Sequence, residues 1–98
     1  MQERHPCVYI LASHRNGTLY VGVTSSLLVR IWQHRNGVVE GFTARHHVHD
    51  LVWLEMHETM NSAIAREKAI KAWKRVWKIK LIEESNPYWR DLYAELCG

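Results

Sequence analysis

Two short apolar runs flank an Asn-Gly pair near the start of the chain, and this arrangement constrains the fold more than any other feature. Residues 7–12 read Cys-Val-Tyr-Ile-Leu-Ala and residues 18–24 read Thr-Leu-Tyr-Val-Gly-Val-Thr, both rich in residues that favour strands. The intervening Asn16-Gly17 is typical of a type I′ turn, which needs two residues that tolerate positive φ. The sequence therefore predicts a β-hairpin in which Tyr9 and Tyr20 share one face.

The register of this hairpin follows from the length of the turn. With Asn16-Gly17 as a two-residue turn, Tyr9 faces Thr24 and Tyr20 faces Ser13. The two tyrosines are then four ladder positions apart, which is about 13 Å along a strand. On this register they share a face but need not touch. Either the turn is longer than two residues, or the substrate and a water lie between the two tyrosines.

A helix and a third strand are expected next. Ser25 or Ser26 can cap a helix that runs to about Asn36 and stops at Gly37. Its apolar stripe follows helical spacing and consists of Leu27, Leu28, Ile31 and Trp32. Residues 38–49 show no periodicity and are interpreted as a loop, whereas the alternation over residues 51–57 predicts the third strand.

The second half of the chain is predicted to be mostly helical. Thr59 or Asn61 can cap a helix over residues 60–82, which contains no Gly or Pro, so one long helix is favoured, with a bend near Trp73 as the alternative. Its expected buried side consists of Ala63, Ile64, Ile70, Trp73, Val76 and Trp77. Asn86-Pro87 ends the helical region, because the residue before a proline avoids helical geometry. A last short helix or turn over residues 88–96 would pack Trp89 and Leu92 on the core.

Composition fits a small intracellular domain. With 98 residues and 47% hydrophobic content, the chain suits one α+β domain over residues 1–98, with a three-stranded antiparallel sheet flanked by helices. Two cysteines, no signal sequence and no apolar stretch of membrane length predict a cytoplasmic protein without a membrane segment. The net charge of +3 hides a basic region, since residues 60–82 carry seven basic residues and one acid, Glu67.

The tyrosine motifs and their spacing resemble the GIY-YIG nuclease superfamily. Val8-Tyr9 is followed after ten residues by Tyr20-Val21-Gly22, and then by Arg30 and His34 on the predicted helix. The likeness is greatest to short single-domain bacterial members, which share three further segments: Val8-Tyr9-Ile10-Leu11, Ala63-Ile64-Ala65-Arg66-Glu67 and Asn86-Pro87-Tyr88-Trp89. Cys7 and Val21 depart from the family's Gly and Ile, and neither side chain would supply a reacting group.

The resemblance implies a role for each matching residue. Tyr9 would be the general base that activates water, and Tyr20 would assist it or position the nucleophile. Arg30 would hold the scissile phosphate. Glu67 would be the single protein ligand of a divalent metal, Mg²⁺ or Mn²⁺. His34 and Asn86 would complete the site.

These roles also agree with the chemistry of phosphodiester hydrolysis. Arg30 offers a permanently charged fork to phosphate, and Glu67 is a hard oxygen ligand of the kind Mg²⁺ prefers. Tyrosine is a poor base at neutral pH because its unperturbed pKa is about 10. We therefore expect a neighbouring cation such as Arg30, or hydrogen bonds to the phenolate, to lower the pKa of Tyr9.

Each of these residues also has a structural interpretation. Tyrosines are common in strands, Arg30 and His34 would suit a solvated helix face, and Glu67 could pair with Lys71 four residues on. Asn86 could simply end a helix before Pro87. It is the joint occurrence at matching spacing that favours the functional interpretation.

The sequence thus predicts a metal-dependent endonuclease that acts on DNA, with RNA left open as the substrate. The resemblance implies that its products carry 5′-phosphate and 3′-hydroxyl ends. The alternative is a nucleic-acid-binding module with weak or no catalysis. No separate DNA-binding domain fits in 98 residues, so a partner protein or a homodimer is left open. The expected nucleic-acid contacts are Arg45, Lys71, Lys74 and Lys78.

Overall fold

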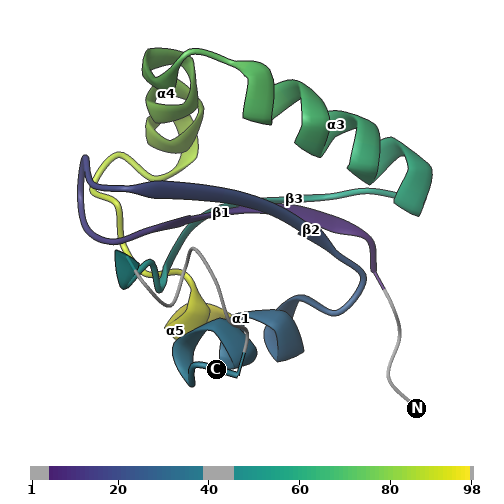
Figure 1. Cartoon of the computed structure of the whole chain (residues 1–98), viewed down its shortest axis with the longest axis horizontal. Helices are drawn as coiled ribbons and strands as arrows, with labels where there is room; N and C mark the ends of the chain where they lie inside the picture. Colours follow the sequence, from purple (N-terminus) through teal and green to yellow (C-terminus); the bar gives the residue numbers. More distant parts are fainter. Residues whose placement is uncertain (1–4, 39–45, 98) are drawn as a thin grey trace.

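The computed structural model describes residues 5–38 and 46–97 and shows an α+β arrangement in that part of the chain (Figure 1). In chain order the elements are β1 (Cys7–Ala12), β2 (Leu19–Thr24), α1 (Leu27–Arg35), β3 (Asp50–Met56), α3 (Met60–Ala72), α4 (Arg75–Ser85) and α5 (Tyr93–Cys97). The expected α+β class with a three-stranded antiparallel sheet is confirmed. None of the described helices is long and apolar enough to cross a membrane.

The first strand forms the centre of the sheet. The strand order is β2-β1-β3, and β1 pairs antiparallel with both neighbours. All six residues of β1 are buried, because helices cover both faces of the sheet. A register shift at Ile10/Leu11 leaves Val52 of β3 as an extra residue between Leu51 and Trp53, which is a β-bulge.

The register predicted for the β1–β2 hairpin is wrong by two residues. Tyr9 faces Gly22 and Tyr20 faces Leu11, because the last ladder pair is Ala12 with Leu19. The connection is therefore longer than the two-residue Asn16-Gly17 turn.

Local hydrogen bonds stabilise this longer connection. The Gly17 N–H donates to the carbonyl of His14 at 2.9 Å, and the Thr18 N–H donates to Ser13 Oγ at 3.0 Å. Asn16 adopts a φ of +59°, whereas Gly17 does not lie in the left-handed region. A Cβ on Gly17 would lie 2.3 Å from Ser13 Oγ, so glycine is needed there for space and not for its φ.

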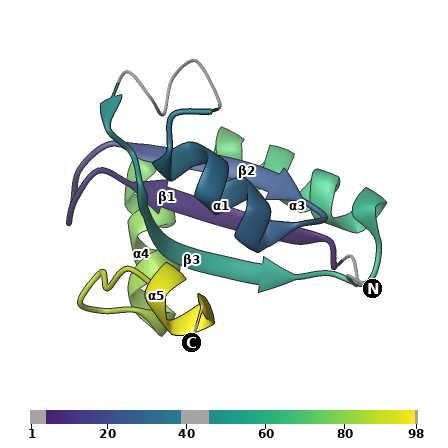
Figure 2. The ribbon, with the colours of Figure 1, turned by 90° about the horizontal axis from the view of Figure 1, so that it is seen from below.

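Helices cover both faces of the sheet, and an apolar cluster is buried under each pair. Figure 1 shows α3 and α4 on one face and α1 and α5 on the other, and Figure 2 views the sheet through α1 and α5. The α3/α4 face buries an apolar cluster that includes Val8, Ile10, Ala63, Ile70, Ile82 and Trp89. The α1/α5 face buries a second cluster of Tyr9, Leu11, Ile31, Val48 and Leu51.

The favoured expectation of one long helix over residues 60–82 is wrong, and the alternative of a bend near Trp73 is confirmed. α3 ends at Ala72, and Trp73 and Lys74 have extended ψ values of 153° and 148° before α4 begins at Arg75. The break turns α4 across the end of the hairpin, where Arg75 Nη2 donates to the carbonyls of Asn16 and Gly17 at 2.7 and 2.6 Å. Tertiary contacts therefore override a stretch that has no local helix breaker.

The break also changes which side chains of α4 are buried. Val76 is 63% exposed and Trp77 is 54% exposed, so their predicted place on the buried side is wrong. Trp89 is buried as predicted, and Leu92 packs on the second cluster. The expected helix starts are confirmed at Thr59, which accepts from the Ser62 N–H, and at Ser26, whose side chain makes no capping bond.

Candidate active site

Tyr9 lies in the middle of the central strand and is 1% exposed. It faces Gly22 on the edge strand β2, and a Cβ on Gly22 would lie 2.4 Å from both Cζ and Oη of the Tyr9 ring. The phenol thus occupies the space that any side chain at position 22 would fill. This contact explains why a glycine interrupts a strand of β-formers.

Tyr20 lies diagonally across from Tyr9 on the same face. Its ladder partner, Leu11, is two residues from Tyr9, and the two tyrosine rings are 6.3 Å apart between centroids. Diagonal neighbours in a sheet are within reach of aromatic side chains. The expected separation of 13 Å is therefore wrong, and the corrected register brings the tyrosines together.

His34 completes a cluster of three rings, defined here as the tyrosine–histidine cluster. It comes from the last turn of α1, is 2% exposed and places its Nε2 at 3.1 Å from Tyr9 Oη. Its ring lies 5.4 Å from the Tyr20 ring. Burial lowers the pKa of His34, and the charges of Arg30 and His49 lower it further, so the imidazole is neutral at pH 7.

Arg30 lies one turn before His34 on α1 and is exposed. Its positive charge acts on both buried members of the cluster, lowering the pKa values of Tyr9 and His34. Arg30 is thus accessible to solvent, and its charge still acts on the buried tyrosine–histidine cluster.

The net pKa shift of Tyr9 is opposite to the expected one. Burial raises the pKa of the phenol above its ordinary value, the neighbouring Tyr20 raises it further, and the charge of Arg30 opposes the change only in part. Removing a phenolate from water outweighs one nearby cation here. Tyr9 is therefore protonated at neutral pH in this conformation.

Glu67 approaches from the helix on the other face of the sheet. It lies on α3 between the buried Ala63 and Ile70, its side chain is 12% exposed, and its Oε2 lies 3.0 Å from Lys71 Nζ. Its negative charge contributes to the raised pKa of Tyr9, so its field reaches the phenol. Glu67 and Arg30 thus act on Tyr9 with opposite signs.

The donors present fit a metal only as a one-carboxylate site. Among the residues that the structure describes, no group of three or more His, Cys, Asp or Glu side chains could hold an ion. Mg²⁺ commonly takes one or two carboxylates and completes its shell with water and substrate phosphate. The partly accessible carboxylate of Glu67 suits that arrangement once Lys71 moves away.

Asn86 lies apart from these residues. It ends α4, which packs on the opposite face of the sheet from Tyr9. Its Nδ2 donates to the carbonyls of Val52 and Arg90 at 3.1 and 2.9 Å, and its Oδ1 accepts from the Arg90 N–H at 3.0 Å. The side chain therefore holds the backbone after α4.

The predicted nucleic-acid contacts fall around the α3–α4 junction. Lys71 pairs with Glu67, Lys74 caps α4, and Lys78 Nζ donates to the carbonyl of Lys71 at 3.3 Å. Arg45, the fourth predicted contact, lies outside the described residues.

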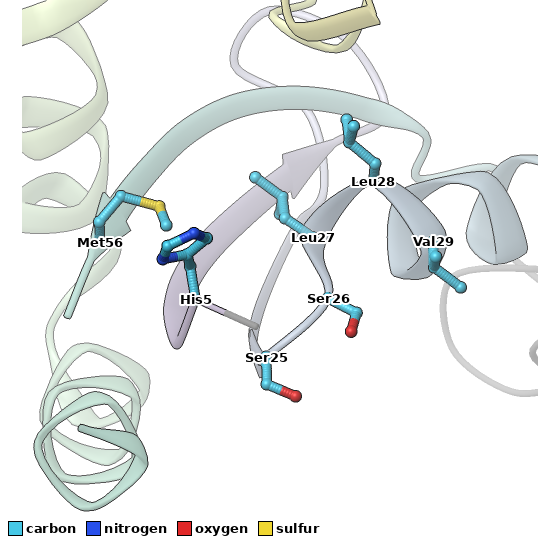
Figure 3. Close-up of a pocket in the computed structure, with 7 residues that line it drawn as sticks. All are labelled: His5, Ser25, Ser26, Leu27, Leu28, Val29 and Met56. Carbon is cyan, nitrogen blue, oxygen red and sulfur yellow. The ribbon is translucent and has the colours of Figure 1, made fainter. Parts of the chain in front are cut away.

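A separate apolar cavity lies at the start of α1. Figure 3 shows Leu27, Leu28 and Val29 of α1 beside His5 and Met56. The cavity has a volume of about 240 Å³, and its lining does not include the tyrosines, Arg30 or Glu67. The candidate site is thus a cluster of side chains beside the β2 edge, outside this hollow.

Comparison with known proteins gives the class that this fold and cluster define. Residues 5–80 match the GIY-YIG catalytic domain family, and the chain therefore belongs to that family. The matched range contains Tyr9, Tyr20, Arg30, His34 and Glu67, and it ends before Asn86.

The relatives are likewise short bacterial proteins. A UPF0213 protein of Staphylococcus saprophyticus is 36% identical over 79% of this chain and 93% of its own length. A UPF0213 protein of Staphylococcus aureus is 38% identical with the same two coverages. The solution NMR structure of the UPF0213 protein BH0048 from Bacillus halodurans superposes with a TM-score of 0.51 at 26% identity, covering 81% of this chain and 83% of that one.

Family membership supports an endonuclease-like function with nucleic acid as the substrate. The structure adds contacts that the family match does not show, at Gly22 and at Arg75. A glycine within a predicted strand indicates either an interruption or a close approach by another group, and at Gly22 the close approach is the one observed. The hairpin contacts of Arg75 carried no signal in sequence spacing. The correct register would have identified Gly22, because that register alone places it opposite Tyr9.

Proposed function

We propose that the chain is a metal-dependent endonuclease that hydrolyses DNA phosphodiesters beside the tyrosine–histidine cluster. The observation that carries this proposal is the 3.1 Å contact between Tyr9 Oη and Nε2 of the neutral His34. Arg30 and Glu67 act on the same phenol from α1 and α3. The phenol thus contacts a proton acceptor, and the charges of a phosphate-binding cation and of a hard oxygen ligand act on it.

Tyr9 and His34 act together as the base in this proposal. A protonated phenol cannot take a proton from water, so Tyr9 must first lose its own. The imidazole accepts that proton at Nε2 when its other proton is on Nδ1, and the phenolate then takes a proton from the attacking water. His34 is suited to this step because its lowered pKa leaves it neutral at pH 7.

Arg30 holds the non-bridging oxygens of the scissile phosphate. Its guanidinium is exposed and can bind phosphate through two parallel hydrogen bonds. The same position brings positive charge to the phenolate as it forms. Tyr20, whose ring packs beside those of Tyr9 and His34, positions the attacking water.

Glu67 holds the metal. Mg²⁺ or Mn²⁺ bound there would supply positive charge to the phosphate and stabilise the leaving 3′ oxygen. The carboxylate must exchange its contact with Lys71, and the freed ammonium group then contacts a neighbouring phosphate. The products are a 5′-phosphate and a 3′-hydroxyl end.

One observation favours the second candidate, a nucleic-acid-binding module with weak or no catalysis. Tyr9 is 1% exposed and its pKa is raised, which makes it a poor base without movement. The basic α3–α4 junction would still bind phosphates in such a module.

The test is incubation of supercoiled plasmid with the full chain and Mg²⁺ or Mn²⁺. We expect nicking by the wild type and a loss of at least about 100-fold in Tyr9→Phe, Arg30→Ala and Glu67→Ala. A fluorescent RNA in a parallel reaction distinguishes the two nucleic acids. Equal residual nicking by all four proteins would overturn the proposal, and salt-dependent binding without cleavage would establish the module instead.

A further inference from the structure

Trp77 is an exposed aromatic side chain on the outer face of α4. It is 54% exposed, and the Trp73 ring lies against it with centroids 6.4 Å apart and an interplanar angle of 79°. The two rings, with Leu81 and Lys80, line an open groove of about 390 Å³. A flat apolar surface beside a cation suits a ligand that is both aromatic and anionic.

The charges around this groove are mainly positive. Lys80 lines the groove three residues after Trp77, and the exposed Lys74 directly precedes α4, three residues before Trp77. Arg66 places its guanidinium carbon 5.2 Å from the centroid of the Trp73 ring, but this guanidinium is paired with Glu55, so the excess positive charge comes from the lysines. Glu84 is the one carboxylate in the lining, at the C-terminal end of the groove.

The groove is connected by contacts to the carboxylate of the candidate site. Lys78, next to Trp77 in α4, donates to the carbonyl of Lys71, and Lys71 pairs with Glu67. Figure 1 shows α4 at the end of α3, so this series of cations passes from one helix to the next. Phosphates that follow it run from the groove toward Glu67.

We propose that the α4 groove binds an unpaired segment of a nucleic-acid strand, with one base stacked on Trp77 and the flanking phosphates on Lys74 and Lys80. The strand then continues over Lys78 and Lys71 to the candidate site; the class of ligand rests on the proposed function. Stacking on an aromatic ring needs the face of a base, which a continuous duplex does not offer. The substrate class is therefore DNA with a single-stranded segment, such as a flap, a gap or a junction.

The first test measures binding without divalent metal, by anisotropy of a fluorescent oligothymidylate and of a duplex of equal length. Trp77→Ala should weaken binding of the single strand by about 5- to 150-fold, whereas Trp77→Phe should retain most of it. The matched control is Trp32→Ala, because Trp32 is 51% exposed on α1 and lies two residues from both Arg30 and His34, on the other side of that helix.

The salt dependence tests the lysines separately. For a single strand, each phosphate contact contributes about 0.7 to the slope of log affinity against log salt concentration. Lys74→Ala should lower that slope by about 0.7 and leave the preference for single strands unchanged. An unchanged slope would contradict a phosphate contact at Lys74.

The outcomes separate this inference from the proposed function. Trp77-dependent binding without nicking by any variant overturns the nuclease and leaves the groove established. Nicking with unchanged single-strand affinity in Trp77→Ala overturns the groove and leaves the nuclease. If Trp77→Ala weakened binding of the single strand and of the duplex equally, the proposed groove would also be overturned. The same holds if light scattering showed that Trp77→Ala converts a dimer to monomers while its affinity for the single strand is unchanged.

Discussion

At the scale of single residues, the Tyr9 ring occupies the space that a side chain at Gly22 would need. The phenol fills the position of a missing Cβ, and this lets Tyr9 reach His34 across the face of the strand pair. Gly22 is therefore as much a part of the site as the groups that react.

Gly22→Ala should damage both stability and activity. The added Cβ would lie 2.4 Å from the buried Tyr9 ring, which cannot move without disturbing His34. We expect a loss of about 1–3 kcal/mol in the free energy of unfolding, measured by urea denaturation, and loss of nicking. In Gly17→Ala the Cβ meets only the side chains of Ser13 and His14 in the turn, so that control should keep its activity.

The motif residues could be predicted from the sequence, but their environment could not. The spacing of Tyr9, Tyr20 and His34 identified three residues that the structure brings together in one cluster, and Arg30 lies one turn before His34 with its charge acting on Tyr9. The raised pKa of Tyr9 was not predictable, because it depends on burial by segments distant in the sequence. The placement of Asn86 likewise follows from its contact with Val52, 34 residues away.

At the scale of elements, the break between α3 and α4 sets the direction of α4 on the face of the sheet opposite α1. Strand positions and helix starts were predictable because apolar periodicity and capping residues mark them. The break was anticipated only as the alternative bend near Trp73, since no Gly or Pro lies between residues 60 and 82 to favour it over one long helix. It depends instead on contacts such as those of Arg75 with the hairpin connection.

Arg75→Ala should therefore loosen the hairpin connection. The two carbonyls it binds would be solvated instead, so we expect a loss of about 1 kcal/mol in the free energy of unfolding. Hydrogen exchange of the residue 13–18 connection should quicken. Lys74→Ala, at the adjacent exposed position, is the control. Equal exchange rates in the two variants would contradict a stabilising contact between Arg75 and the hairpin connection.

The ion pair between Glu67 and Lys71 should compete with metal binding. Lys71→Met removes a pair worth about 0.3–0.5 kcal/mol and frees the carboxylate. We expect half-maximal nicking at a lower Mn²⁺ concentration than in the wild type. Lys68→Met, an exposed neighbour on the same helix, is the matched control, and a higher Mn²⁺ requirement in Lys71→Met alone would count against Glu67 as the ligand.

At the scale of the whole molecule, two buried ionisable groups should limit stability at opposite ends of the pH range. His34 has a lowered pKa in the folded state, so the unfolded chain binds its proton more readily and stability falls as pH decreases below about 6.5. Tyr9 has a raised pKa, so stability falls as pH increases above about 10, where the unfolded tyrosine ionises.

Urea midpoints between pH 5 and pH 11 should therefore form a plateau with a fall on each side. His34→Gln should flatten the acid side, and Tyr9→Phe should flatten the alkaline side. Tyr88→Phe is the control for removing a phenol from the surface, because Tyr88 is 77% exposed. Identical profiles for all of these proteins would contradict the burial of the Tyr9–His34 pair.

The most direct test of the account is the pH dependence of cleavage under single-turnover conditions with saturating metal. If His34 takes the phenol proton and Tyr9 then takes the proton of water, both groups are already in the required protonation state at pH 7. The wild-type rate should therefore be constant from pH 7 to pH 9.5 and fall at lower pH as His34 becomes protonated, and Tyr9→Phe should lose the rate. A wild-type rate that rises steadily from pH 7 to pH 9.5 while chemistry limits turnover would contradict this proton transfer, because it would require the site to lose a proton to solvent before the reaction.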